Sequence, residues 1–260
     1  MILAAVLAVQ ASAASILVVT LPTQHTASVT APRIVAAQSL GGTRTDALLA
    51  RVRTDLDDAV AAVEQFWGSD WPREIVVVAT DSPQQFAAQA HLDPGRDWNG
   101  IAAVAVADEV DLANRRVIGQ RIVLAPGASE MSDTALRIVL THELFHLAAR
   151  ADTALDAPRW LTEGVADFVA RPAAPLPPGA GAETALPSDA ELDGPNRSMG
   201  YDRAWWFARF VADSFGVDGL HRLYTLACGP GHGDFSWAVG EAFDIDPTEL
   251  QSRWAVWLNR

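Results

Sequence analysis

The chain has 260 residues, of which half are hydrophobic and a fifth are charged, a composition that is typical of a globular protein and excludes intrinsic disorder. Its formal net charge of −13 repels phosphate backbones, which argues against a nucleic-acid partner. The single cysteine, Cys228, excludes an internal disulfide and a zinc site built from thiolates. Any metal ion in this protein would therefore be held by His, Asp and Glu.

The chain begins with an apolar segment. Residues 2–21 contain no charged side chain and are close to the length of about 20 residues that spans a bilayer. The small residues 11–13 would suit signal-peptide cleavage, but the usual positive residues before the apolar run are missing. We therefore expect residues 1–21 to be a signal peptide or a membrane anchor, which would place the protein outside the cytoplasm, either secreted or attached to the membrane. Residues 22–42 are small and polar, and we expect a linker there.

A folded body is expected to begin near residue 43. Apolar residues recur at helical spacing over residues 46–66, which predicts an amphipathic helix. The β-branched run at 74–80 predicts a strand, and residues 82–90 predict a helix after it. Residues 43–130 should thus form a half that contains a small mixed sheet.

Two further apolar runs, at residues 101–107 and 117–124, are separated by a polar stretch and are expected to pair as a hairpin. We expect residues 117–124 to be the edge strand on which an extended peptide would pair through backbone hydrogen bonds.

The second half, residues 131–260, is predicted to be mainly helical. A helix is expected at 133–150, and more helices after Pro158. Residues 172–197 interrupt them with Pro, Ala and Gly, and a loop of this length between two site elements should border a cleft. The fold class predicted from the sequence is α+β, with an active-site cleft between a sheet-containing half and a helical half.

A metal-binding pattern lies inside the predicted helix at 133–150. Residues 142–146 read His-Glu-Leu-Phe-His, which is an HExxH sequence. His142 and His146 are four residues apart, so both imidazoles leave the same face of the helix and can reach one ion. Glu143 lies beside them, where a carboxylate can accept a proton from an attacking water.

A third protein ligand is needed to complete such a site and leave one position open. Glu163 and Asp167 are four residues apart on the next predicted helix, and Glu163 is the expected ligand. Asp167 is expected to accept the free N–H of a liganding histidine. Asp152 stays open as a substitute third ligand. Gly164 is unfavourable in a helix, and a close approach to the histidine helix would explain it.

These two motifs carry a resemblance to a known family. The sequences HELFH and WLTEGVADFV resemble the gluzincin metallopeptidases, most closely the peptidase MA-like group, whose second motif reads approximately W-L-x-E-G-x-A. The resemblance covers roughly residues 70–258. It implies a zincin-like fold, zinc held by His142, His146 and Glu163, Glu143 as general base, and a peptide or protein substrate.

The developing oxyanion needs a donor besides the metal. Tyr201 follows the Pro-rich loop, and the resemblance also implies a tyrosine there in active relatives; His232 and His221 are the alternatives. The leading hypothesis is a zinc metallopeptidase, and the acidic chain favours neutral or basic peptides. The alternatives are an inactive zincin-like scaffold or binding module at the membrane or cell surface, whose cleft the Pro-rich loop closes, and an anchored interaction protein without metal.

Overall fold

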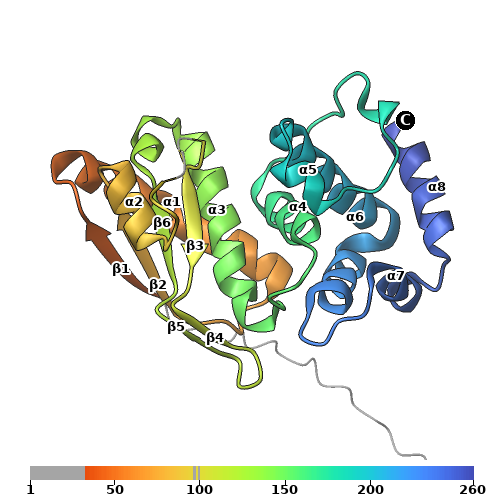
Figure 1. The fold of residues 1–260 in the computed structure, drawn as a ribbon, viewed down its shortest axis with the longest axis horizontal. Helices are drawn as coiled ribbons and strands as arrows, with labels where there is room; N and C mark the ends of the chain where they lie inside the picture. Colours follow the sequence, from red (N-terminus) through yellow and green to blue (C-terminus); the bar gives the residue numbers. More distant parts are fainter. Residues whose placement is uncertain (1–32, 96–97, 99) are drawn as a thin grey trace, which may run out of the picture. The chain divides into compact units, whose positions relative to one another are not determined.

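The computed structural model describes residues 33–95, 98 and 100–260 (Figure 1). It has the α+β organisation that the sequence predicts, with a small mixed sheet in the first half and a helical second half. The first half contains β1 (Ile34–Ser39), α1 (Thr43–Trp67), β2 (Glu74–Ala79), α2 (Pro83–Gln89), β3 (Ala103–Val106), β4 (Glu109–Asp111), β5 (Arg116–Ile118), β6 (Arg121–Leu124) and the 3-10 turn η1 (Pro126–Glu130). The second half contains α3 (Asp133–Ala149), η2 (Arg150–Asp152), α4 (Arg159–Ala170), η3 (Ala180–Ala182), α5 (Asp189–Asp193), α6 (Arg197–Cys228), α7 (Phe235–Phe243) and α8 (Pro247–Leu258).

The predicted signal peptide or anchor, residues 1–21, lies outside the described residues. Within the part of the chain that the structure describes, no helix combines the length and the apolar character needed to cross a membrane.

The main sheet has the strand order β1-β2-β6-β3. The strands β1, β2 and β6 run parallel, and β3 runs antiparallel to β6. The predicted hairpin is thus confirmed for residues 103–106 and 121–124, whereas residues 117–118 pair with β4 instead. The polar stretch inside this hairpin forms a second, two-stranded sheet of β4 and β5.

The prediction that residues 117–124 form the edge strand is wrong. Strand β6 lies between β2 and β3, and the edge of the sheet on this side is β3. Ile122, Val123 and Leu124 are all fully buried, as expected for a strand that has neighbours on both sides and both faces covered.

The predicted linker is also wrong in part, because residues 34–39 form β1, which pairs with β2 along its whole length. The folded body begins at Arg33, ten residues before the expected start. The small residues of this strand, such as Ala36 and Ala37, resemble a linker in sequence, since only the partner strand identifies them as part of a sheet.

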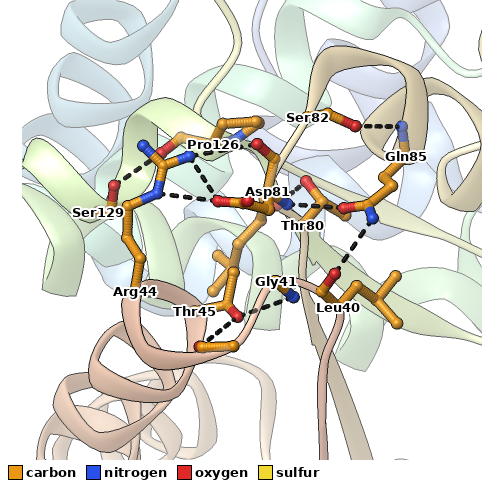
Figure 2. Close-up of polar contacts among 12 residues, drawn as sticks. Leu40, Gly41, Arg44, Thr45, Thr80, Asp81, Ser82, Gln85, Pro126 and Ser129 are labelled. Atoms are coloured by element: carbon orange, nitrogen blue, oxygen red, sulfur yellow. Dashed lines mark hydrogen bonds and ion pairs between the residues drawn. The ribbon is translucent and has the colours of Figure 1, made fainter.

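Polar contacts fix the carboxyl ends of β1 and β2 to the start of α1 (Figure 2). The guanidinium of Arg44 donates to the Asp81 carboxylate at 2.7 and 3.0 Å. The Thr45 hydroxyl accepts from the Gly41 N–H at 3.0 Å, and the Gln85 amide oxygen accepts from the Asp81 N–H at 2.8 Å. These contacts set the direction in which α1 leaves the sheet, and α1 packs in turn against α3.

The helical half is built around aromatic residues. Five tryptophans, namely Trp160, Trp205, Trp206, Trp254 and Trp257, are buried in its core. Helix α4 packs on α6 and also on α3, which borders the edge strand β3 (Figure 1). The helix α3 therefore lies where the sheet-containing half meets the helical half.

Gly164 lies where α4 closely approaches a neighbouring helix. A Cβ atom at this position would lie 2.4 Å from the carbonyl oxygen of Ala204 on α6. The close contact that we expected is present, but its partner is α6 and not the histidine helix. The glycine thus sets the depth at which α4 packs against α6.

Replacing Gly164 by alanine should destabilise the protein by about 1–3 kcal/mol, because overpacking against backbone outweighs the better helix propensity of alanine. Gly240 in α7 is the matched control, since a Cβ there meets nothing within 4 Å. We expect Gly240→Ala to be neutral or stabilising by at most about 1 kcal/mol. Urea unfolding of both variants measures the difference, and equal stabilities would contradict the packing argument.

Candidate metal centre

The helix α3 aims the HExxH side chains into a cleft. Its first turn is capped by Ser132, whose hydroxyl accepts from the Ala135 N–H. Leu140 and Leu144 are fully buried on the core side of the helix. With that face held in the core, His142 and His146 project toward α4 on the other side.

Three donor atoms converge between α3 and α4. The Nε2 atoms of His142 and His146 lie 3.1 Å apart, and the Oε2 atom of Glu163 lies 3.1 Å from the first and 3.7 Å from the second. A tetrahedral zinc site with bonds of about 2.0–2.1 Å has edges of about 3.3 Å. The spacing of these atoms therefore suits one tetrahedral metal ion, and they form the three-residue group able to hold a metal in the described part of the chain.

A second layer of polar contacts orients His142. Its Nδ1 atom lies 3.0 Å from an oxygen of Asp167, whose other oxygen accepts from the Arg171 guanidinium at 3.1 Å. Arg171 is held in turn by Asp202 at 2.8 Å and stacks over Trp205. A hydrogen bond from Nδ1–H to Asp167 leaves the lone pair on Nε2, the nitrogen that faces the other two donors.

The electrostatics of the site favour positive charge between the three side chains. Burial alone lowers the pKa of His142, but its contacts with Asp167 and Glu163 outweigh this and hold the pKa well above its usual value. Burial alone would raise the pKa of Glu163, but the neighbouring His146 and His142 keep it far below its usual value. Both shifts arise because the imidazoles and the carboxylates stabilise opposite charges on one another at the point where these side chains meet.

Glu143 lies beside the three donors and is held by the edge strand. Its Oε2 atom accepts a hydrogen bond from the backbone N–H of Ala105 in β3 at 2.7 Å. The side chain is buried but lines the cleft. One carboxylate oxygen is thus fixed by the sheet, and the other can accept a proton.

The cleft has a volume of about 1150 Å³ and contains the three donors, Glu143 and Tyr201 in its lining. Tyr201 is partly buried, and burial raises the pKa of its phenol above the usual value, so the phenol stays protonated at neutral pH. Its hydroxyl makes no hydrogen bond to any residue in the described ranges. The range 172–197, predicted as a Pro-rich loop, contains η3 and α5, and it borders the cleft, as expected, through Leu192 and Asp193 of α5 and Arg197 at the start of α6.

The structure places the other candidates away from this centre. The carboxylate of Asp152 is paired with Arg115 at 2.8 Å, and the structure does not bring it into the group formed by His142, His146 and Glu163. His221 packs against the rings of Phe66 and Trp67. His232 contacts the backbone carbonyl of the next residue, and neither it nor His221 lines the cleft.

Three residues at the site were missed by the sequence analysis. Arg171 lies four residues after Asp167, a spacing that could have suggested the pair on one helix face. Ala105 acts through its backbone, which no sequence pattern reports. Arg150 follows the HExxH helix and donates to the Ala105 carbonyl oxygen at 2.7 Å, an interaction that depends on the position of β3.

Comparison of the sequence with protein-family models and with curated proteins gives no match.

Removing the Glu163 carboxylate should abolish stoichiometric zinc binding, because two imidazoles remain where a stable site uses three or four ligands. Asp152→Ala is the matched control. Asp152, like Glu163, is a carboxylate that follows the HExxH motif in the sequence, but it pairs with Arg115. Metal content after dialysis, together with chelator competition, compares Glu163→Ala with this control. Equal zinc retention by both variants would show that Glu163 is not a ligand.

The Asp167→Asn variant should bind zinc about 10- to 100-fold more weakly, the usual effect of losing the carboxylate that orients a metal-binding histidine. Asp193→Asn serves as a control, because Asp193 lines the same cleft but pairs with the exposed Arg159. Competition with a coloured chelator measures both affinities. An unchanged affinity in Asp167→Asn would assign Asp167 to packing alone.

Proposed function

We propose that this protein is a zinc-dependent peptidase with a zincin-like fold of the gluzincin type. The observation that carries the proposal is the set of three donor atoms at tetrahedral spacing, with the Glu143 carboxylate beside them in a cleft. The resemblance of both motifs to the peptidase MA-like group points to the same activity.

Edge strand β3 offers a place for an extended peptide. The Ala125 N–H donates to the Ala102 carbonyl across the hairpin, and bonded pairs alternate along an antiparallel ladder. The backbone groups of Ala103 and Ala105 therefore face away from β6, and both residues line the cleft. Those of Ala105 are bonded to Glu143 and Arg150, which leaves Ala103 to pair with a substrate backbone.

Bound by His142, His146 and Glu163, zinc would supply a Lewis acid that polarises the scissile carbonyl and acidifies water. Glu143 then accepts a proton from the attacking water and delivers it to the leaving nitrogen. The Ala105 N–H holds this carboxylate in position by its hydrogen bond to Oε2. Tyr201 donates its phenolic proton in a hydrogen bond to the developing oxyanion.

The alternative of an inactive scaffold rests on closure of the cleft by the Pro-rich loop. Among residues 172–197, those that line the cleft are Leu192, Asp193 and Arg197. Because the cleft has a volume of about 1150 Å³ with these residues in its lining, no observation favours its closure and hence the scaffold. The proposal that the enzyme acts outside the cytoplasm, secreted or anchored to a membrane, rests on the composition of residues 1–21 alone.

Replacing Glu143 by glutamine should lower kcat on cleaved peptides by about 10²- to 10⁴-fold, the usual contribution of a general base, and leave zinc content unchanged. Glu109→Gln is the control, since Glu109 is an exposed carboxylate on β4. Zinc-loaded proteins are compared on a broad peptide library. Identical cleavage by wild type and Glu143→Gln would reject the peptidase.

The two tyrosines of the chain allow a matched test of the oxyanion donor. Tyr201→Phe should lower kcat by about 10²- to 10³-fold with little change in KM, because the hydrogen bond forms in the transition state. Tyr224 also lines the cleft, but its hydroxyl is bonded to that of Thr153 at 2.8 Å. Tyr224→Phe should affect stability more than kcat. If Tyr224→Phe lowered kcat more than Tyr201→Phe, Tyr201 would not be the oxyanion donor.

A further inference from the structure

Arg150 is a cationic side chain of the cleft that the proposed reaction does not use. It follows α3 directly and lies seven residues after Glu143, so two helical turns bring both side chains to the same face. Both line the cleft, and both contact Ala105 of the edge strand. Arg150 therefore faces the path along which a peptide would lie.

The guanidinium of Arg150 has most of its donors free. Of its five N–H groups, one hydrogen bond is formed, from Nη2 to the Ala105 carbonyl oxygen at 2.7 Å. Its Nε atom is buried without an acceptor in the described part of the chain. No carboxylate among residues 33–95, 98 and 100–260 forms an ion pair with it. By contrast, Arg171 in the same cleft is paired with both Asp167 and Asp202.

A partly buried charge without a direct ion pair is costly, and burial lowers the pKa of the guanidinium although the Glu143 and Glu163 carboxylates act in the opposite direction. The planar fork of arginine is suited to bidentate recognition of a carboxylate. The Nη1 group and the second N–H of Nη2 belong to a side chain that lines the cleft, and they match the chemistry of a carboxylate on a ligand.

The contacts with Ala105 also limit how far Arg150 lies from the general base. The Glu143 oxygen and the Arg150 nitrogen are joined by two hydrogen bonds of 2.7 Å and the backbone of one residue. They are thus at most about 10 Å apart. An extended peptide advances about 3.3 Å per residue, so this span covers up to three residues.

We propose that Arg150 binds a carboxylate of the bound peptide, within three residues of the bond that is hydrolysed. This inference rests on the proposed peptidase function and deepens it by naming a substrate class. The carboxylate is either the carboxyl terminus of the peptide or an Asp or Glu side chain, and both present the same chemistry to the guanidinium. A substrate with such a carboxylate differs from the neutral or basic peptides that the net charge of the chain favours.

Binding of a peptide series tests the inference without turnover. The full chain carrying Glu143→Gln is loaded with zinc and titrated with fluorescent peptides that differ in one group: a free carboxyl terminus against an amidated one, and Glu against Gln near the terminus. Arg150→Gln is then added to the same background. Glutamine removes the charge and keeps an N–H donor on a shorter side chain, so binding of the neutral peptides reports whether loss of the bond to the Ala105 carbonyl oxygen disturbs the edge strand.

We expect Arg150→Gln to weaken binding of the carboxylate peptides about 10- to 100-fold, and that of their neutral counterparts little, because a charged hydrogen bond is lost in the first case alone. Arg116→Gln, which alters an exposed arginine on β5, should change neither. If the affinity difference between the free and the amidated peptide disappears in Arg150→Gln, the carboxylate is the carboxyl terminus. If the difference between the Glu and Gln peptides disappears, it is a side chain.

Equal weakening for charged and neutral peptides, or no weakening, would overturn the inference and leave Arg150 as a support for β3. Thermal unfolding of each variant checks that it is folded. Cleavage by the wild-type protein is measured separately, so absence of hydrolysis rejects the proposed function, whereas loss of the carboxylate preference in Arg150→Gln is judged from binding alone.

Discussion

The candidate site depends on how closely α4 packs between α3 and α6. Glu163 can meet His142 and His146 because the helix that carries it lies directly against the HExxH helix. On its other side, α4 approaches the backbone of α6 at Gly164, the residue next to Glu163. A larger side chain there would push α4 away from α6, and distances of 3.1–3.7 Å between donor atoms tolerate little displacement.

The same packing explains why the polar contacts that orient His142 come from both α4 and α6. Asp167 lies one turn after Glu163 and reaches His142 on α3, while Arg171 joins Asp167 to Asp202 on α6. The imidazole is therefore oriented by groups from all three helices. A shift of any of them would change the direction of Nε2, so the geometry of the candidate metal site depends on the packing of the helical half.

The parts of this site that could be predicted are those encoded by local spacing. His142, Glu143 and His146 are fixed by one helical turn, and Glu163 and Asp167 by another, so helical periodicity alone assigns each set to one face. The unpredicted parts depend on contacts between distant segments. Strand β1 needs β2 to be recognised, the edge position of β3 follows from the insertion of β6 beside β2, and the partner of Gly164 is a backbone carbonyl of α6.

The net charge of the chain likewise does not predict which substrate the cleft would prefer. The chain carries −13, yet Arg150, Arg159, Arg171 and Arg197 all line the cleft. At physiological salt, the field of exposed charges decays over about 8 Å, so distant acidic groups act weakly on a ligand inside the cleft. Arg171 is neutralised by two carboxylates, whereas the charge of Arg150 is not balanced by a direct ion pair with any described residue. Any preference of this cleft for a charged ligand would thus depend on which of its own charges stay unpaired, a property of the folded structure that composition does not report.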